Sequence, residues 1–428
     1  MTIAGFNQMT SCIEKEQNRS LRMKRAVVIV VDSMGIGAMP DAPKYGDLME
    51  CNTLVNVARF NNGLKLPNFE KMGLGNIDKI EGVKSNNAPI ASFGKMLEVS
   101  EGKDTTTGHW EIAGLILEEP FRTYPNGFPQ FLIDEFIQKT NCGGVLGNIP
   151  ASGTAILDNL GDEHVKTGFP IVYTSADSVF QVACHVDVIP LETLHKWCEI
   201  AREMLDSHSS DHNVCRVIAR PFTGTSKNFK RISAGRRDYS VPPKKPTILN
   251  KIVDAGGSVV GIGKIEDIFV KSGVTKAIHT GTNKEGLELT LKALENKIEG
   301  EDHLITYKDI KNPEISLIFT NVVDTDMLFG HRNDAVGYGR AIEEIDLYLE
   351  KILPLITKDD LLIITADHGC DPTVPGTDHT REMIPVLVYN PELKARDLGL
   401  RTTFADIAKT IAEWLNVSYD EIGSSLIS

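Results

Sequence analysis

No stretch of this 428-residue chain is apolar for the roughly 18–20 residues that a membrane-spanning helix needs. The chain has no Cys-x-x-Cys pair, and its seven cysteines do not suit a disulfide framework, so reduced thiols in a cytosol are expected. An excess of positive charge is also absent. The formal net charge of −13 argues against non-specific nucleic-acid binding, although it leaves room for a local basic site. We therefore expect a cytoplasmic protein with neither a membrane nor a nucleic-acid partner.

Residues 1–24 are polar and irregular, and they lack the apolar centre of a secretory signal. We expect them to be a disordered extension or a cloning remnant. The rest of the chain has the composition of a globular protein, with 41 % hydrophobic and 24 % charged residues overall. Its length suits two or three domains, and no internal repeats are present.

From residue 25 onward, apolar strands alternate with amphipathic helices. The segment 26–31 is an uninterrupted apolar run, typical of a parallel strand that is covered on both faces. Further strands are predicted at 92–97, 258–263, 315–320, 361–365 and 384–389, and helices at 47–62, 191–205, 247–255, 290–296, 334–352 and 403–415. This alternation predicts an α/β fold with a mostly parallel sheet and helices on both of its faces.

The character of the sequence changes between residues 119 and 241. Proline and glycine clusters, short alternating strands and one clear helix replace the α/β rhythm there, and a proline-rich segment follows at 242–246. We expect residues 25–118 and 242–428 to form one catalytic core. An α+β cap domain, residues 119–241, would then be inserted into it.

Three consecutive threonines follow Asp104 and precede a short helical run. Asp and Thr are preferred at helix N-caps, so the simplest interpretation is a capped helix. A helix N-terminus also favours phosphate and negative charge, so one of these hydroxyls could act as a nucleophile. The spacing does not choose among the three threonines.

Asp and His residues follow several predicted strands, at the edge where open α/β sheets place their sites. Each residue alone could be a helix cap, but several of them converging at one edge are harder to explain in that way. Together they offer three carboxylates and three imidazoles: Asp32, Asp326, His331, Asp367, His368 and His379. Such donors suit Mn²⁺ or Zn²⁺, and six ligands suffice for two metals about 3.5–4 Å apart.

Two segments of the expected cap domain have strand-like alternation. In 170–180, a period of two would place Ser175, Asp177 and Val179 on one face, and in 216–220 it aligns Arg216, Ile218 and Arg220. Such mixed faces could bind a phosphorylated sugar. The alternative is an ordinary solvated strand face.

Five segments, 31–37, 102–111, 324–334, 366–369 and 376–382, resemble the motifs of the phosphopentomutase family. This family belongs to the alkaline phosphatase superfamily and has a cap domain inserted into its core. The resemblance extends from about Arg25 to the C-terminus, and the run at 103–111 is its most specific part. It implies interconversion of ribose 1-phosphate and ribose 5-phosphate, and of their 2-deoxy analogues, in nucleoside salvage.

The resemblance also implies a role for individual residues. Thr105 would carry the phosphoryl group, and Asp324 would not be a metal ligand. One Mn²⁺ would bind Asp32, Asp367 and His368, and the second would bind Asp326, His331 and His379. The sugar phosphate would contact Ser175, Asp177, Val179, Arg216 and Ile218 from the cap and Lys264 from the core, with Arg220 and Arg236 left open. Glucose 1,6-bisphosphate or ribose 1,5-bisphosphate would be the activator.

Three other readings compete with this one. A hydrolase of the same superfamily would transfer the phosphoryl group to water, and the inserted domain argues against it. A related phosphoglycerate mutase would carry a serine in a different loop. A non-enzymatic metal-binding or scaffold protein would have a vestigial site in which ligands are missing, and no ligand is missing here.

Overall fold

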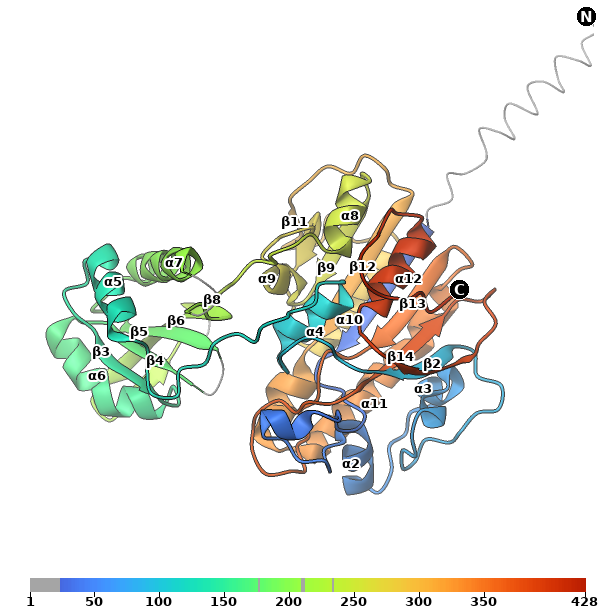
Figure 1. The fold of residues 1–428 in the computed structure, drawn as a ribbon, viewed down its shortest axis with the longest axis horizontal. Coiled ribbons are helices and arrows are strands. Elements are labelled where there is room, and N and C mark those ends of the chain that lie inside the picture. The colour runs from blue at the N-terminus through green and yellow to red at the C-terminus, as the bar shows by residue number, and fades with distance from the viewer. Residues whose placement is uncertain (1–23, 176–177, 209–211, 233–234) are drawn as a thin grey trace, which may run out of the picture.

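The computed structural model describes residues 24–175, 178–208, 212–232 and 235–428, which form two separate β-sheets with their own helices (Figure 1). The larger sheet has nine strands in the order β11-β10-β9-β12-β1-β13-β14-β2-β15. Its strands are β1 (Lys24–Val31), β2 (Ser92–Met96), β9 (Ser258–Ile262), β10 (Lys276–Ile278), β11 (Ile305–Thr306), β12 (Ile315–Val322), β13 (Asp360–Thr365), β14 (Ile384–Tyr389) and β15 (Asp397–Arg401).

Strand β1 lies in the middle of this sheet and pairs in parallel with both β12 and β13. Its residues 26–31 are completely buried, as the uninterrupted apolar run predicts for a strand covered on both faces. Five of the eight strand pairs are parallel, and the antiparallel ones involve β11 and β14. The predicted mostly parallel sheet is therefore confirmed.

Two groups of helices cover the sheet. In one group, α2 (Thr53–Phe60), α3 (Pro67–Met72) and α10 (Asn283–Leu294) pack on α11 (Ala335–Ile352). The other group consists of α4 (Thr105–Ile112), α8 (Ile248–Asp254), α9 (Ile265–Phe269) and α12 (Asp406–Leu415). In Figure 1, α2, α3 and α11 lie on one side of the strands and α8 and α12 on the other, as predicted for helices on both faces.

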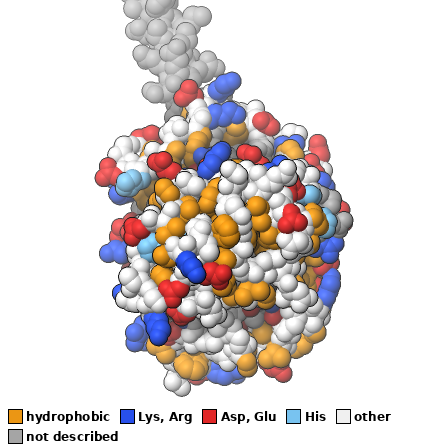
Figure 2. Space-filling model, turned by 90° about the vertical axis from the view of Figure 1, so that its left-hand side faces the viewer, with side chains coloured by type: hydrophobic (Ala, Val, Ile, Leu, Met, Phe, Trp, Pro, Cys, Tyr) orange, Lys and Arg blue, Asp and Glu red, His pale blue; other side chains and the backbone are white. Residues whose placement is uncertain are grey.

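The second sheet contains β3 (Leu146–Pro150), β4 (Ile171–Thr174), β5 (Val179–His185), β6 (Arg216–Thr225) and β7 (Asn228–Arg231), in that order, and β8 (Arg237–Ser240) pairs with β6. Its helices are α5 (Gln130–Thr140), α6 (Ala155–Thr167) and α7 (Leu191–Ser207). It has hydrophobic clusters of its own on both faces. Figure 2 views this end of the molecule, where acidic and basic side chains are interspersed rather than separated by sign.

The prediction of a single strand across residues 170–180 is wrong. Strands β4 and β5 form an antiparallel pair, with Ile171 opposite Ala183, and the chain reverses between them. Ser175 and Ser178 lie between the two strands, and serine favours turns because its side chain hydrogen-bonds to nearby backbone. Ser175 therefore lies after β4 rather than within a strand, and Asp177 lies outside the described residues.

Two predicted helices begin at different places. The helix expected over 47–62 starts only at Thr53, because Asn52 caps it, its side chain accepting a hydrogen bond from the backbone N–H of Val55. The helix expected from residue 290 begins at Asn283, where the side chain of Thr282 caps it. Among the helices of the described ranges, none is long and apolar enough to cross a membrane.

Asp346 of α11 joins this helix to α3 through a buried carboxylate. Its oxygens accept hydrogen bonds from the backbone N–H groups of Asn68 and Phe69, at 3.0 and 2.8 Å, and from the Asn68 amide at 3.0 Å. Since Asp346→Ala would leave these donors without a partner, we expect it to lower the free energy of unfolding by roughly 2–3 kcal/mol. Urea unfolding followed by circular dichroism measures this loss. Glu350→Ala, on an exposed position of the same helix, is the control; an equal loss there would contradict the assignment.

Candidate active site

Three parallel strands bring most of the predicted metal ligands together. Asp32 directly follows β1, Asp326 comes shortly after β12, and Asp367 and His368 follow β13. Because the carboxyl ends of neighbouring parallel strands meet at one edge of a sheet, these side chains converge there. Asp326 lies in the single π-helical turn Thr325–Phe329, a distortion that often marks functional sites.

The first group contains Asp32, Asp367 and His368, whose ligand atoms lie within 4.8 Å of one another. The Nε2 atom of His368 is 3.3 Å from Asp32 Oδ1 and 3.5 Å from Asp367 Oδ2. All three side chains are buried. This is the set expected for the first metal.

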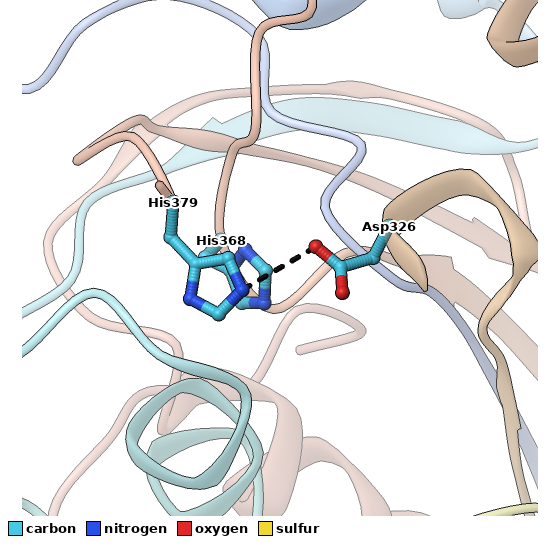
Figure 3. Close-up of side chains that lie close together, drawn as sticks. All are labelled: Asp326, His368 and His379. Carbon is cyan, nitrogen blue, oxygen red and sulfur yellow. Dashed lines mark ion pairs between the residues drawn. The ribbon is translucent and has the colours of Figure 1, made fainter. Parts of the chain in front are cut away.

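The second group surrounds Asp326. Its Oδ2 lies 3.3 Å from His331 Nε2, its Oδ1 lies 3.3 Å from His379 Nε2, and the two imidazole nitrogens are 3.1 Å apart. Figure 3 shows the ring of His379 in front of that of His368, with the ion pair from His379 to Asp326; the two ring centroids are 4.0 Å apart. The two groups are therefore adjacent, and His368 can also be grouped with Asp326 and His379.

The donors of both groups fit bound divalent cations. Among the described residues, Asp32 Oδ1, Asp326 Oδ1 and Asp367 Oδ2 are buried oxygens without a hydrogen-bond partner. A buried carboxylate oxygen without a donor is costly, and a cation would offset that cost. The Nδ1 atoms of His331 and His368 lie 2.6 and 3.0 Å from the carbonyl oxygens of Thr377 and Gly369. Donation from Nδ1 leaves Nε2 available to a metal.

The carboxylates also control the protonation of the imidazoles. Burial opposes the charged form of His331, but the hydrogen bond to Asp326 prevails and raises the pKa of His331 to about 12. Burial likewise opposes protonation of His368, yet the neighbouring Asp367 and Asp32 raise its pKa well above the usual range. The raised pKa values favour the doubly protonated, charged form of both rings, and a bound metal would have to displace one of the two ring protons.

Helix α4 presents the three threonines to this site. Asp104 is its N-cap and accepts hydrogen bonds from the backbone N–H groups of Thr106 and Thr107, at 3.0 and 3.2 Å, and from the Thr107 hydroxyl at 2.6 Å. The Thr105 hydroxyl points elsewhere, 3.1 Å from His368 Nε2. The helix-cap interpretation therefore applies to Asp104, and the hydroxyl beside the candidate metal ligands is that of Thr105.

Helix α4 contacts the loop of Asp367 without an intervening side chain. A Cβ atom at Gly108 would lie 2.1 Å from the Asp367 carbonyl oxygen, so only glycine allows this approach. Sequence reasoning missed His109, which is fully buried in the same helix. Its Nδ1 lies 3.1 Å from Asp367 Oδ2 and 2.9 Å from the Thr105 carbonyl oxygen. The four-residue spacing from Thr105, which places both residues on one helix face, was the available signal.

Two further neighbours were also missed. The Asn321 amide donates to Asp32 Oδ2 at 3.2 Å and so orients that carboxylate. The Cys370 sulfur can be grouped with Asp326 and His331, and its thiol is buried. Cys370 directly follows the segment Asp367–Gly369, but a lone cysteine carries no metal-binding pattern in the sequence. Asp324, which the resemblance excludes as a ligand, belongs to none of the possible ligand sets among the described residues, which are Asp32 with Asp367 and His368, Asp326 with His368 and His379, and Asp326 with His331 and Cys370.

Three of the predicted cap residues, Val179, Arg216 and Ile218, lie near the starts of β5 and β6. Val179 of β5 pairs directly with Arg216 of β6, and two residues further along both strands Gln181 pairs with Ile218. The start of β6 also reaches α4: burial raises the pKa of the Cys215 thiol to about 12, and a hydrogen bond with Thr106 acts against this rise. Residues next to Arg216 therefore contact the helix of the three threonines.

Several charged side chains gather nearby. Asp238 of β8 lies 3.6 Å from Arg216 Nη1 and accepts two hydrogen bonds of 2.7 Å from Arg236. Arg220, the other open assignment, donates to the Gln181 side chain at 3.0 Å. Lys264, which directly follows β9 and Gly263, and Asp238 both act electrostatically on Asp267, whose pKa is raised mainly by burial. Charged side chains associated with the two sheets thus approach each other.

Sequence comparisons identify the family. A family model described as the metalloenzyme superfamily matches residues 24–419. The phosphopentomutase of Caldanaerobacter subterraneus subsp. tengcongensis is 53 % identical over 406 residues, which cover 95 % of this chain and 98 % of that protein. The phosphopentomutase of Carboxydothermus hydrogenoformans is 54 % identical over 392 residues, covering 91 % and 95 %. The chain belongs to the phosphopentomutase family. It is therefore a mutase, an isomerase that transfers a phosphoryl group.

Solved structures with a similar arrangement are distant. The PH0037 protein of Pyrococcus horikoshii has a TM-score of 0.48 at 14 % identity, covering 94 % of this chain and 99 % of that one. A phosphoglycerate mutase of Leishmania mexicana has a TM-score of 0.46 at 12 % identity, covering 95 % and 98 %. Membership of the phosphopentomutase family rests on the sequence matches. It counts against the hydrolase, phosphoglycerate mutase and non-enzymatic readings.

Metal binding should release protons, because coordination requires neutral imidazoles while the metal-free pKa values of His331 and His368 are raised. We expect the apparent Mn²⁺ affinity to increase with pH, by about tenfold per pH unit for each proton released. Isothermal titration calorimetry in buffers of different ionisation enthalpy measures the number of protons. His331→Gln should release one proton fewer. A binding heat that does not depend on the buffer would contradict the assigned protonation.

Proposed function

We propose that this mutase interconverts ribose 1-phosphate and ribose 5-phosphate, and their 2-deoxy analogues, as a step of nucleoside salvage in the cytoplasm. The reaction would proceed through phosphorylated Thr105 and a sugar bisphosphate, with two Mn²⁺ ions per chain. One observation carries the choice of nucleophile. Of the three threonines, Thr105 has its hydroxyl 3.1 Å from His368, whereas the Thr107 hydroxyl is engaged by Asp104.

The surroundings of Thr105 suit a phosphoryl group. Thr105 is the first residue of α4, where the helix dipole and backbone N–H groups favour negative charge. Two divalent cations, held by the ligand sets expected from the sequence, would offset negative charge on the transferring phosphoryl group. Cys215, directly before strand β6, contacts the same helix through Thr106. A bound sugar phosphate would therefore lie between α4 and the cap.

The chain's own residues account for the transfer steps. Phosphorylated Thr105 donates its phosphoryl group to the free hydroxyl of the bound sugar phosphate: the bond from phosphorus to Oγ1 breaks, a bond to the sugar oxygen forms, and the hydroxyl proton passes to Oγ1. The resulting bisphosphate reorients in the site, or is released and recaptured. The Thr105 hydroxyl then takes the other phosphoryl group and returns a proton to the sugar oxygen. A covalent intermediate divides one difficult transfer into two easier ones.

Residues 119–241 would act as the cap that recognises the sugar phosphate and excludes water. Arg216 and Lys264 offer positive charge to its phosphate, and Val179 and Ile218 offer apolar surface. Ser175 would add a hydroxyl, and the predicted contact of Asp177 lies outside the described residues. Water exclusion matters because hydrolysis of phosphorylated Thr105 would end the cycle. Glucose 1,6-bisphosphate or ribose 1,5-bisphosphate would prime Thr105 again.

The reaction can be followed by phosphorus NMR, with ribose 1-phosphate, Mn²⁺ and a trace of glucose 1,6-bisphosphate. We expect ribose 5-phosphate without free phosphate. Thr105→Ala should reduce turnover by more than about 1,000-fold because it removes the nucleophile. Thr105→Ser keeps a hydroxyl and should retain measurable turnover. Stoichiometric free phosphate would identify a hydrolase instead, and full activity of Thr105→Ala would exclude Thr105 as the nucleophile.

Arg216 should contribute to substrate binding through its charge. We expect Arg216→Met to raise the KM for ribose 5-phosphate by about tenfold or more, because a hydrogen bond to a charged group contributes roughly 1.5–3 kcal/mol. Arg237→Met is the matched control, since Arg237 is exposed and neighbours Asp238 on the alternating strand β8. Steady-state kinetics of both variants measure the difference. Equal KM values would remove Arg216 from the substrate site.

A further inference from the structure

The guanidinium of Arg381 is buried two residues after His379, with only 2 % of the residue exposed. Its Nη1 donates to Glu98 Oε2 at 2.5 Å and to the carbonyl oxygens of Ser100 and Gly102 at 2.9 and 2.6 Å. Its Nη2 donates to the Glu98 carbonyl oxygen at 3.0 Å. The segment 98–102, which we call the turn before α4, is thereby held to the loop of a candidate metal ligand.

Two aspartates reinforce this connection. Asp41 accepts from Arg381 Nε and Nη2, at 3.3 and 3.2 Å. Asp47 Oδ2 accepts the backbone N–H of Arg381 at 2.8 Å, while Asp47 Oδ1 accepts from Lys103 Nζ at 2.8 Å. Lys103 immediately follows the turn before α4. The segment from Glu98 to Lys103 is thus bound at several points to Arg381 or its backbone.

The turn before α4 is also joined to α4 itself. Glu111 of α4 accepts the backbone N–H groups of Val99 and Ser100, at 3.0 and 2.7 Å. Turn and helix therefore form one unit that carries Thr105. Glu111 holds this unit together by accepting the N–H groups of Val99 and Ser100. Arg381 connects the unit to the loop of His379 by donating to carbonyl oxygens of the turn before α4.

Glu382, the next residue, makes contacts in a different direction. Its carboxylate accepts the Thr53 N–H and hydroxyl, at 2.8 and 2.7 Å, and the Thr380 hydroxyl at 2.6 Å. A Cβ atom at Gly35 or Gly369 would lie 2.4 Å from its carboxylate oxygens. Glu382 therefore packs against the loops that follow Asp32 and His368, while Arg381 reaches the unit that carries Thr105.

We propose that Arg381 is a positioning residue that sets the Thr105 hydroxyl against the candidate metal ligands. The inference rests on the proposed function, in which Thr105 is the nucleophile. A planar guanidinium with five N–H donors can serve three carbonyl groups and two carboxylates together. The ammonium of a lysine carries its three N–H donors on a single nitrogen, so it cannot reach all of these carbonyl groups and carboxylates. Displacement of a reacting group by about 1 Å can cost about 100-fold in rate.

The test measures phosphorylation of Thr105 in a single turnover, using glucose 1,6-bisphosphate, Mn²⁺ and the full chain, with intact-mass detection. We expect Arg381→Gln and Arg381→Lys to slow this step by about 100-fold. Calorimetric Mn²⁺ affinity should change by less than about threefold in both variants, because no ligand is altered. Arg381→Lys retains the charge beside Glu98 and Asp41. Its unfolding temperature should therefore be closer to that of the wild type than the unfolding temperature of Arg381→Gln, whereas its rate of Thr105 phosphorylation should remain slow.

Arg25→Gln is the matched control. Arg25 is also buried, donates to Asp360 at 2.8 Å and to the Leu294 carbonyl oxygen at 3.0 Å, and lies near the opposite end of β1 from Asp32. We expect it to lower the unfolding temperature and leave the phosphorylation rate within about twofold of the wild type, since it lies far from α4.

Four outcomes would overturn the inference. Wild-type phosphorylation rates in both Arg381 variants would remove the positioning role. An equal loss of rate in Arg25→Gln, or a rate in Arg381→Lys that recovers together with stability, would show a general stabilising role only. If the wild-type chain gains no phosphoryl group at Thr105, the proposed function fails and this inference falls with it. If Arg381→Gln does not fold, the Lys variant decides.

Discussion

Burial of like charges at the carboxyl ends of β1, β12 and β13 is the constraint on which the rest of the site depends. Asp32, Asp326 and Asp367 are packed close together, and each has an oxygen for which the described residues provide no hydrogen-bond partner. Isolated buried carboxylates would be strongly unfavourable, so their neighbours must supply positive charge. Imidazoles do so in the absence of a cation, which is why His331 and His368 have raised pKa values. A bound cation and a protonated imidazole would both compensate the negative charge of these carboxylates, so one would replace the other.

The core and the convergence of the candidate metal ligands could be predicted because two local patterns agree. Uninterrupted apolar runs such as 26–31 mark buried parallel strands, and acidic residues directly after them lie at the edge where such sheets form sites. The choice of Thr105 could not come from spacing, since all three threonines suit a helix start. The resemblance selected it, and the distance to His368 supports it. That distance depends on tertiary packing of α4 against the segment Asp367–Gly369.

Other features escaped prediction because they arise from contacts distant in sequence. Residues 170–180 alternate in a way that looks like one continuous strand. The chain breaks there because β4 and β5 pair directly with each other as antiparallel strands. Asp47 does not extend α2 because its carboxylate is engaged by Lys103 and by the backbone of Arg381. His109 and Arg381 looked like ordinary polar residues. Their contacts with Asp367 and with the turn before α4 appear only once the sheet is assembled.

The central position of β1 has a consequence for biosynthesis. Both of its neighbours come from the last third of the chain, and the Ser33 backbone N–H donates to Asp367 across 334 residues of sequence. A nascent chain therefore carries the apolar strand β1 and the candidate ligand Asp32 for most of its synthesis before the strands that pair with β1 are made. Such long-range pairing is slow and exposes unpaired strand edges to aggregation. The complete set of candidate metal ligands exists only after the loop of His379 has been made, so tight metal binding at this site would require the finished chain.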